Sequence, residues 1–246
     1  MDLHKHKLPT TRVWSAKLSA HLAKEHTDEF ELWWTPDKWN WEYCSVYLAK
    51  YCSEYFYIWW NPEKFNWKEH SWALAEYCID YFGEWWNPDK WNWENYSWTL
   101  CYNCSKYFDI WWNPEKFNWK FNSSSLAEYC SDYFEKWWNP DKWNWESCSY
   151  ALPRYCAKYI KTWWTPDKFN WSQCSDELAK YCSEYFNIWW NPQKFNWSRV
   201  YQLDHYCYEY ADIWLCDYFK IMNLSKAILH IKDFDKLKMK LILNSR

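Results

Sequence analysis

The nonamer "WWNPEKFNW", residues 59–67, decides the fold because close copies of it recur along the chain. Successive copies begin 26 residues apart. A fixed period of this size is typical of a repeat array, in which each unit buries its apolar face by stacking on its neighbours. The copies begin at Trp33, Trp59, Trp85, Trp111, Trp137, Trp163 and Trp189.

The composition favours helices over strands. The chain has 246 residues, among them 28 Trp, 22 Tyr and 13 Phe, but only one glycine. Hairpins and barrels depend on glycine for turns with positive φ, so an all-β array is not expected. The aromatic content also argues against a disordered chain, because disordered segments are poor in aromatic residues.

Each repeat is predicted to contain a long helix and a short one. Within residues 45–60 the apolar positions are spaced by three and four residues, as in a helix that faces a core. Ser45, at the start of this stretch, suits an N-cap. The following "NP" at residues 61–62 suits the cap and first position of a second helix, which we expect to end near residue 67.

The predicted fold class is therefore all-α: an α-solenoid of about eight 26-residue helix-turn-short-helix repeats with a C-terminal capping helix. We divide the chain into an N-terminal basic tail (1–18), the tandem Trp-rich repeats (19–215) and a basic amphipathic C-terminal capping helix (216–246). The alternative for the last segment is a helix that binds a partner or a membrane surface. No apolar run is long enough to span a membrane, and no secretory signal opens the sequence.

Charge is distributed unevenly along the chain. The net charge is −3, while residues 1–18 carry +3 and residues 219–246 carry +5. The intervening residues therefore carry −11. An acidic array of this kind is a poor binder of polyphosphate, so we expect nucleic-acid binding to be weak or absent.

The twelve cysteines are predicted to be structural. Seven share an inward-facing slot, which follows a tyrosine in all but Cys104, and equivalent atoms of stacked repeats should lie about 8–10 Å apart. A disulfide needs Cα atoms within about 7 Å. We therefore expect buried thiols in a reducing compartment, with no metal and no cofactor. The seven are Cys52, Cys78, Cys104, Cys130, Cys156, Cys182 and Cys207.

No residue pattern indicates catalysis. The seven histidines occupy no repeated slot, and the chain contains no phosphate-binding loop, nucleophile elbow or zinc-protease motif. We therefore do not expect an enzyme, and we name no catalytic, cofactor-binding or metal-ligating residue.

One candidate ligand site is a ladder of one lysine and one asparagine per repeat. Such a column resembles the one-base-per-repeat arrangement of helical RNA readers. The alternative is that each lysine pairs with an acid of the adjacent repeat or stacks on tryptophan, while each asparagine caps the end of the short helix. The ladder consists of Lys38, Lys64, Lys90, Lys116, Lys142, Lys168 and Lys194, with Asn40, Asn66, Asn92, Asn118, Asn144, Asn170 and Asn196.

The string "YCSEYFYIWWNPEKFNW", residues 51–67, resembles the tryptophan-rich tandem repeats of uncharacterised proteins from giant amoeba-infecting DNA viruses. The resemblance covers residues 19–215. It implies a viral origin and expression in a host cytoplasm, but it carries no activity, ligand or site.

The function that we predict is a non-enzymatic repeat scaffold for protein–protein interaction in the cytoplasm, with another protein as its partner. The first alternative is a single-stranded nucleic-acid-binding protein that uses the Lys/Asn ladder. The second is a structural component of a viral particle or factory that self-associates through its C-terminal helix.

Overall fold

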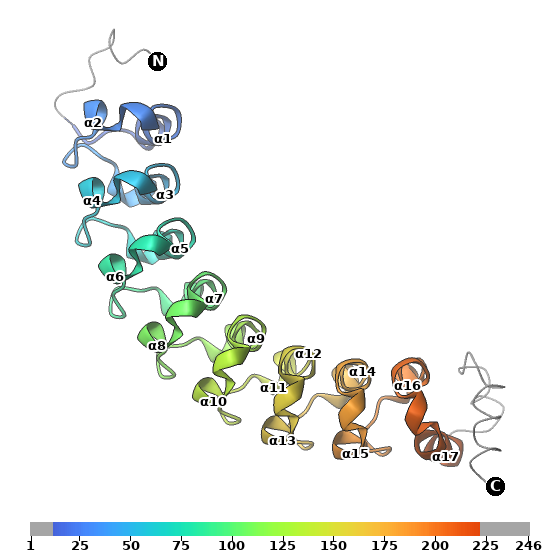
Figure 1. Cartoon of the computed structure of the whole chain (residues 1–246). Coiled ribbons are helices and arrows are strands. Elements are labelled where there is room, and N and C mark those ends of the chain that lie inside the picture. Colours follow the sequence, from blue (N-terminus) through green and yellow to red (C-terminus); the bar gives the residue numbers. More distant parts are fainter. Residues whose placement is uncertain (1–11, 222–246) are drawn as a thin grey trace. The chain divides into compact units, whose positions relative to one another are not determined.

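The structure is a computed structural model that describes residues 12–221. These residues contain helices and turns but no strand, and neighbouring repeats of one compact unit pack on each other, which confirms the predicted α-solenoid of about eight repeats. Contacts divide the chain into two compact units, residues 1–118 and 119–246. In the first unit the long helices form one row, and the short helices form a second row beside it (Figure 1).

Long and short helices alternate along the chain. A 3-10 turn, such as Ser53–Tyr55, precedes each short helix. The long helices are α1 (Ala16–Glu25), α3 (Trp41–Tyr51), α5 (Trp67–Tyr77), α7 (Trp93–Cys104), α9 (Trp119–Tyr129), α11 (Trp145–Cys148) with α12 (Ala151–Cys156), α14 (Trp171–Tyr181) and α16 (Val200–Tyr206). The short helices are α2 (Phe30–Trp33), α4 (Phe56–Trp59), α6 (Phe82–Trp85), α8 (Phe108–Trp111), α10 (Phe134–Trp137), α13 (Ile160–Trp163) and α15 (Phe186–Trp189).

The helix boundaries within a repeat differ from the prediction. The stretch predicted as one long helix, residues 45–60, is interrupted at Cys52, where φ is −121° and ψ is 26°. The Cys52 carbonyl accepts a bond from the Tyr55 N–H at 3.0 Å and another from the Trp59 indole at 2.7 Å. The tertiary bond to the indole takes up an acceptor that a continuous helix would use, so the chain turns here.

The predicted serine N-cap is wrong. Ser45 is fully buried inside α3, where its hydroxyl donates to the Trp41 carbonyl and accepts from the Asn66 N–H at 3.2 Å. The cap of α3 is Asn40, whose side chain accepts from the Tyr43 N–H at 3.2 Å. The asparagines of the ladder therefore begin the long helices and do not end short ones.

The second helix predicted from residue 61 does not form there, because the "NPEK" segment, residues 61–64, forms a single turn. The Asn61 side chain caps that turn by accepting from the N–H groups of Glu63 and Lys64 at 3.0 and 3.1 Å. The Trp67 indole donates to the Pro62 carbonyl at 2.8 Å and so joins the turn to the start of α5. The short helix of each repeat lies before the turn.

The first tryptophan of each nonamer is the centre of its repeat. Trp59 is 1% exposed, and its bond to the Cys52 carbonyl satisfies the indole N–H inside the core. The same bond recurs over the same seven-residue separation throughout the described array. The pairs are Trp33–His26, Trp59–Cys52, Trp85–Cys78, Trp111–Cys104, Trp137–Cys130, Trp163–Cys156, Trp189–Cys182 and Trp214–Cys207.

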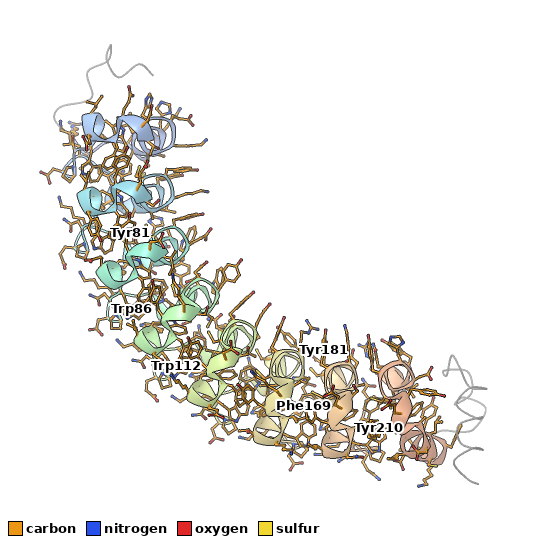
Figure 2. The ribbon with its side chains drawn as sticks, viewed as in Figure 1. Tyr81, Trp86, Trp112, Phe169, Tyr181 and Tyr210 are labelled. Carbon is orange, nitrogen blue, oxygen red and sulfur yellow. The ribbon has the colours of Figure 1, made fainter. Side chains whose placement is uncertain are left out.

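Adjacent repeats are joined by stacked rings. Phe56 of α4 lies parallel to Tyr81 of the next repeat, with ring centroids 4.4 Å apart. Within each unit this stack recurs as Phe30–Tyr55, Phe82–Tyr107, Phe134–Tyr159 and Phe186–Tyr210. Figure 2 shows the side chains that fill the space between the helices. Offset aromatic pairs contribute about 0.5–1.5 kcal/mol beyond their buried area, so the stacks stabilise these joints. In α13, Ile160 takes the place of the phenylalanine.

The last described helix, α17 (Ala211–Ile221), packs on the final repeat. Tyr218 lies 5.1 Å from the Trp197 ring, and the Trp190 indole donates to the Asp217 carboxylate at 3.0 Å. The predicted boundary between residues 215 and 216 falls inside this helix. The rest of the predicted capping helix, residues 222–246, and the first eleven residues of the predicted basic tail lie outside the described residues.

Candidate binding surface

Most lysines of the ladder pair with acids of the preceding repeat. The Lys90 ammonium lies 2.6 Å from the Glu63 carboxylate and donates to the Pro62 carbonyl at 3.0 Å. The Lys64 ammonium hydrogen-bonds to Asp37 and keeps the pKa of that carboxyl below its usual value. The pairs within the two units are Lys64–Asp37, Lys90–Glu63, Lys116–Asp89, Lys168–Asp141 and Lys194–Asp167.

The asparagines of the ladder join adjacent long helices. The Asn92 side chain accepts from the Asn95 N–H at 3.2 Å and donates to the Lys68 carbonyl of the preceding repeat at 2.6 Å. The ladder therefore has a structural role, and its use as a ligand site stays a prediction. The amides donate in the pairs Asn40–Trp14, Asn66–Glu42, Asn92–Lys68, Asn118–Glu94, Asn144–Lys120, Asn170–Glu146 and Asn196–Ser172.

Replacing Asn92 by alanine should lower the free energy of unfolding by about 1–3 kcal/mol, because it removes an N-cap and an inter-repeat hydrogen bond. Urea unfolding followed by far-UV circular dichroism measures the loss. Asn187→Ala, at an exposed position of α15, is the control and should change the value by less than about 0.5 kcal/mol. Equal effects of the two variants would contradict the structural role of Asn92.

Replacing Lys90 by alanine should cost less than about 1 kcal/mol, because an ion pair near the surface gains little in water. Its carboxylate partner, Glu63, is 82% exposed. The cost should shrink further when the salt concentration rises, because salt screens such pairs. Urea unfolding at low and high salt measures both effects, and a salt-independent loss of several kcal/mol would contradict this account.

A cluster of aromatic side chains, which we call the aromatic face, covers the outer side of three neighbouring long helices in the first unit. Tyr43 is 60% exposed, Trp98 43% and Tyr102 57%. The other four rings of the cluster, on α3 and α5, are half-buried. Large exposed apolar patches are typical of interaction sites. The aromatic face comprises Tyr43, Tyr47 and Tyr51 of α3, Trp72 and Tyr77 of α5, and Trp98 and Tyr102 of α7.

Sequence reasoning allowed an exposed aromatic platform for bases or sugars as the alternative to core packing but did not locate this surface, although the repeats carry a signal for it when they are compared position by position. The ladder positions hardly change from copy to copy, whereas the position of Tyr47 varies although it is buried as Ala73, Thr99 and Ala151 in other copies. Three positions on the surface of the long helices also change freely. These positions hold Tyr43, Glu69, Asn95, Phe121, Ser147 and Gln173; Val46, Trp72, Trp98, Ser124, Tyr150 and Asp176; and Lys50, Glu76, Tyr102, Glu128, Arg154 and Lys180.

In the second unit the corresponding surface contains an open pocket of about 680 Å³ between α9 and α11–α12. Ser124 lines it at the position where α5 and α7 carry the bulky Trp72 and Trp98, so a small residue leaves the space. Pro153 cannot donate a helical hydrogen bond, and the break between α11 and α12 precedes it.

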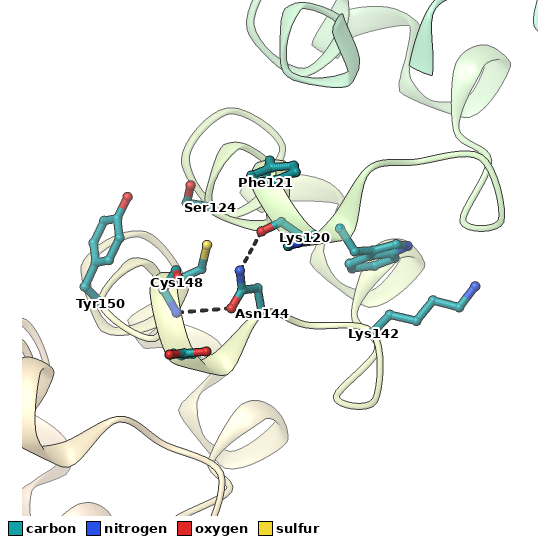
Figure 3. Close-up of a pocket in the computed structure, with 10 residues that line it drawn as sticks. Lys120, Phe121, Ser124, Lys142, Asn144, Cys148 and Tyr150 are labelled. Atoms are coloured by element: carbon teal, nitrogen blue, oxygen red, sulfur yellow. Dashed lines mark hydrogen bonds between the residues drawn. The ribbon is translucent and has the colours of Figure 1, made fainter. Parts of the chain in front are cut away.

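The lining of this pocket combines rings with polar groups. Phe121, which is 69% exposed, and Tyr150 supply apolar surface. Figure 3 shows that Asn144 bridges the Lys120 carbonyl and the start of α11, while Lys142 extends away from the other labelled side chains. The volume lies within the range of ligand sites, roughly 300–1,000 Å³, and is sufficient for one large side chain of a partner.

The seven cysteines of the repeated slot are buried, as predicted. Burial raises the pKa of Cys78 to about 12, so the thiol stays protonated at neutral pH. Within residues 12–221, no group of three His, Cys, Asp or Glu side chains is placed to hold a metal ion. No helix in that range has the length and apolar character needed to cross a membrane.

Comparison with known proteins yields no match to a protein family, to a curated protein or to a solved structure. The functional argument therefore depends on the geometry of the chain itself.

Proposed function

We propose that the protein is a non-enzymatic repeat scaffold that binds a partner protein through its aromatic face. The observation that carries the proposal is the composition of the variable surface positions of α5 and α7, which hold the half-buried Trp72 and the exposed Trp98 and Tyr102. Random substitution at a position that contacts only water would favour polar residues. Tryptophan and tyrosine are instead the residues that dominate the binding energy of protein interfaces.

The internal roles of the ladder support the same choice. Its lysines and asparagines are engaged in joints between repeats, which explains why they change little among the copies. Some variable positions also contact the next repeat, since Arg154 pairs with Glu177 and the Lys50 ammonium lies near the Tyr77 ring, but these contacts depend on residues that are not repeated in every copy. This division is expected of a scaffold whose core is fixed and whose outer side is adapted to a partner.

The proposal is tested by affinity capture from the native cells with a matched set of variants. Trp72→Ser and Trp98→Ser together introduce the residue that α9 carries at this position, Ser124, so the fold should persist. The control is Ile58→Thr with Ile110→Thr, which alters two exposed residues before the turn. It introduces the residue that α13 carries at this position, Thr162. We expect the tryptophan variant to lose protein partners that the wild type and the control retain, with and without nuclease. Identical capture by all three would overturn the proposal.

The nucleic-acid alternative has its own measurement. Because the ladder lysines pair with carboxylates, we expect single-stranded RNA or DNA to bind no tighter than about 10⁻⁴–10⁻⁶ M at physiological salt. Fluorescence anisotropy with Lys64, Lys90 and Lys116 changed together to alanine tests this. Nanomolar binding that falls in the triple variant would favour the alternative.

The cytoplasmic location and the viral origin also remain proposals. Fractionation of the native cells followed by immunoblotting tests the location, and we expect the protein in the cytosolic fraction. Recovery in a membrane or extracellular fraction would contradict it.

A further inference from the structure

The aromatic face carries acidic side chains among its rings. Glu69 and Glu76 flank Trp72 at helical spacings of three and four residues, so all three lie on one side of α5. Glu42 lies beside Tyr43, and its hydrogen bond to the phenol raises the pKa of that tyrosine. With Glu94, Lys50 and Lys68 included, the exposed charged residues of α3, α5 and α7 have a net charge of −2.

The rings between adjacent long helices already hold cations from the chain itself. The Lys50 ammonium lies 5.4 Å from the centre of the Tyr51 ring and 5.6 Å from that of Tyr77, one ring on each of two neighbouring helices. In the second unit, the Arg154 guanidinium lies 5.4 and 5.5 Å from the rings of Tyr150 and Tyr181 in the same manner. Cations within about 6 Å of a ring centre are attracted by its electron-rich face. This surface is therefore suited to basic side chains.

The chain contains a segment with the complementary composition. Residues 222–246, outside the described residues, have six basic and two acidic side chains, a net charge of +4, together with many leucine and isoleucine residues. We propose that residues 222–246 of a second copy dock on the aromatic face, with their lysines beside Glu42, Glu69 and Glu76 and their aliphatic side chains on the rings. The proposal rests on the proposed function, because it identifies the partner of the same face.

A contact of this kind joins two different surfaces of the same chain. Head-to-tail contacts continue into rings or filaments instead of stopping at a dimer. Electrostatic complementarity sets the register of such contacts and makes them sensitive to salt. We therefore expect the average mass of the 246-residue chain to rise continuously with concentration and to fall when salt is added.

Charge exchange tests the docking. Glu42→Lys with Glu69→Lys and Glu76→Lys should weaken association at least about tenfold, and so should Lys232→Glu with Lys236→Glu and Lys238→Glu. Mixing the two variants pairs a reversed face with a reversed tail and should restore the lost association. The control changes Glu54, Asp80 and Glu84, three exposed acids of the same repeats outside the aromatic face, to lysine. Sedimentation velocity over a concentration series gives the mass of each sample.

The outcomes separate this inference from the proposed function. Recovery in the mixture, with little effect of the control, supports docking of a second copy. A mass that stays monomeric at every concentration overturns it, as does a control that weakens association as much as the face variant. If the mass is monomeric while Trp72→Ser with Trp98→Ser still loses captured proteins, the binding face stands and its partner is a different protein.

Discussion

Replacing Trp85 by alanine is expected to lower the free energy of unfolding by about 3–5 kcal/mol, the range for large aromatic residues in protein cores. The side chain is 1% exposed, and its indole donates to the Cys78 carbonyl at 2.8 Å. The variant leaves a cavity and removes the bond that turns the chain between α5 and α6. Urea unfolding followed by far-UV circular dichroism measures the loss, and a change below about 0.5 kcal/mol would contradict the core assignment.

A second tryptophan of the same repeat provides the matched control. Trp91 is 4% exposed, yet no acceptor among the described residues lies within hydrogen-bond distance of its indole nitrogen. Phe65 and Phe117 occupy the equivalent position in the flanking repeats. Trp91→Phe should therefore change the free energy of unfolding by less than about 1.5 kcal/mol, the usual limit for a well-tolerated core exchange. A loss for Trp91→Phe as large as that expected for Trp85→Ala would contradict this expectation.

The sequence predicted the period, the helical class and the buried slots because these depend on local spacing. The 26-residue step and the apolar positions around Leu48 are visible without any knowledge of long-range contacts. Burial of the cysteine slot followed from its place beside the apolar stripe. These features repeat in every copy, so each copy strengthens the same prediction.

The helix boundaries could not be predicted in the same way, because tertiary hydrogen bonds determine them. Ser45 has the composition of an N-cap, but its hydroxyl binds the N–H of Asn66, 21 residues later. Cys52 interrupts a pattern suited to a continuous helix because the Trp59 indole binds its carbonyl. Local sequence preferences describe only hydrogen bonds to residues nearby in the sequence, so Asn40 was not recognised as the cap.

For the candidate site, the most conspicuous sequence pattern proved to have a structural role. The ladder was conspicuous in the sequence because it is invariant, and the structure gives its side chains internal partners such as Glu63 for Lys90. The aromatic face was overlooked because Trp72 and Trp98 differ from their counterparts in the other copies. In an array of recent duplicates, the invariance of the ladder reflects its joints between repeats, and variation at exposed positions is the basis on which we propose a binding surface.

The buried cysteines predict a loss of stability at alkaline pH. Burial raises the pKa of each of five thiols of the repeated slot to about 12, whereas a thiol in the unfolded chain has a pKa of about 8.5. A raised pKa means that the folded state holds its proton more tightly, so this stabilisation is complete below pH about 8.5 and is lost as the pH rises toward 12. The five are Cys52, Cys78, Cys156, Cys182 and Cys207.

Within that window each thiol should reduce the free energy of unfolding by about 1.4 kcal/mol per pH unit, so the five together should unfold the array within one or two units above pH 9. Urea unfolding at pH 7, 8, 9 and 10 in the presence of a reductant measures the slope. Cys78→Ala serves as the control: its stability at pH 7 should be lower, but its slope should be smaller by about 1.4 kcal/mol per pH unit. Stability that stays constant between pH 8 and 10, or an unchanged slope in the variant, would show that the thiols are not held protonated by burial.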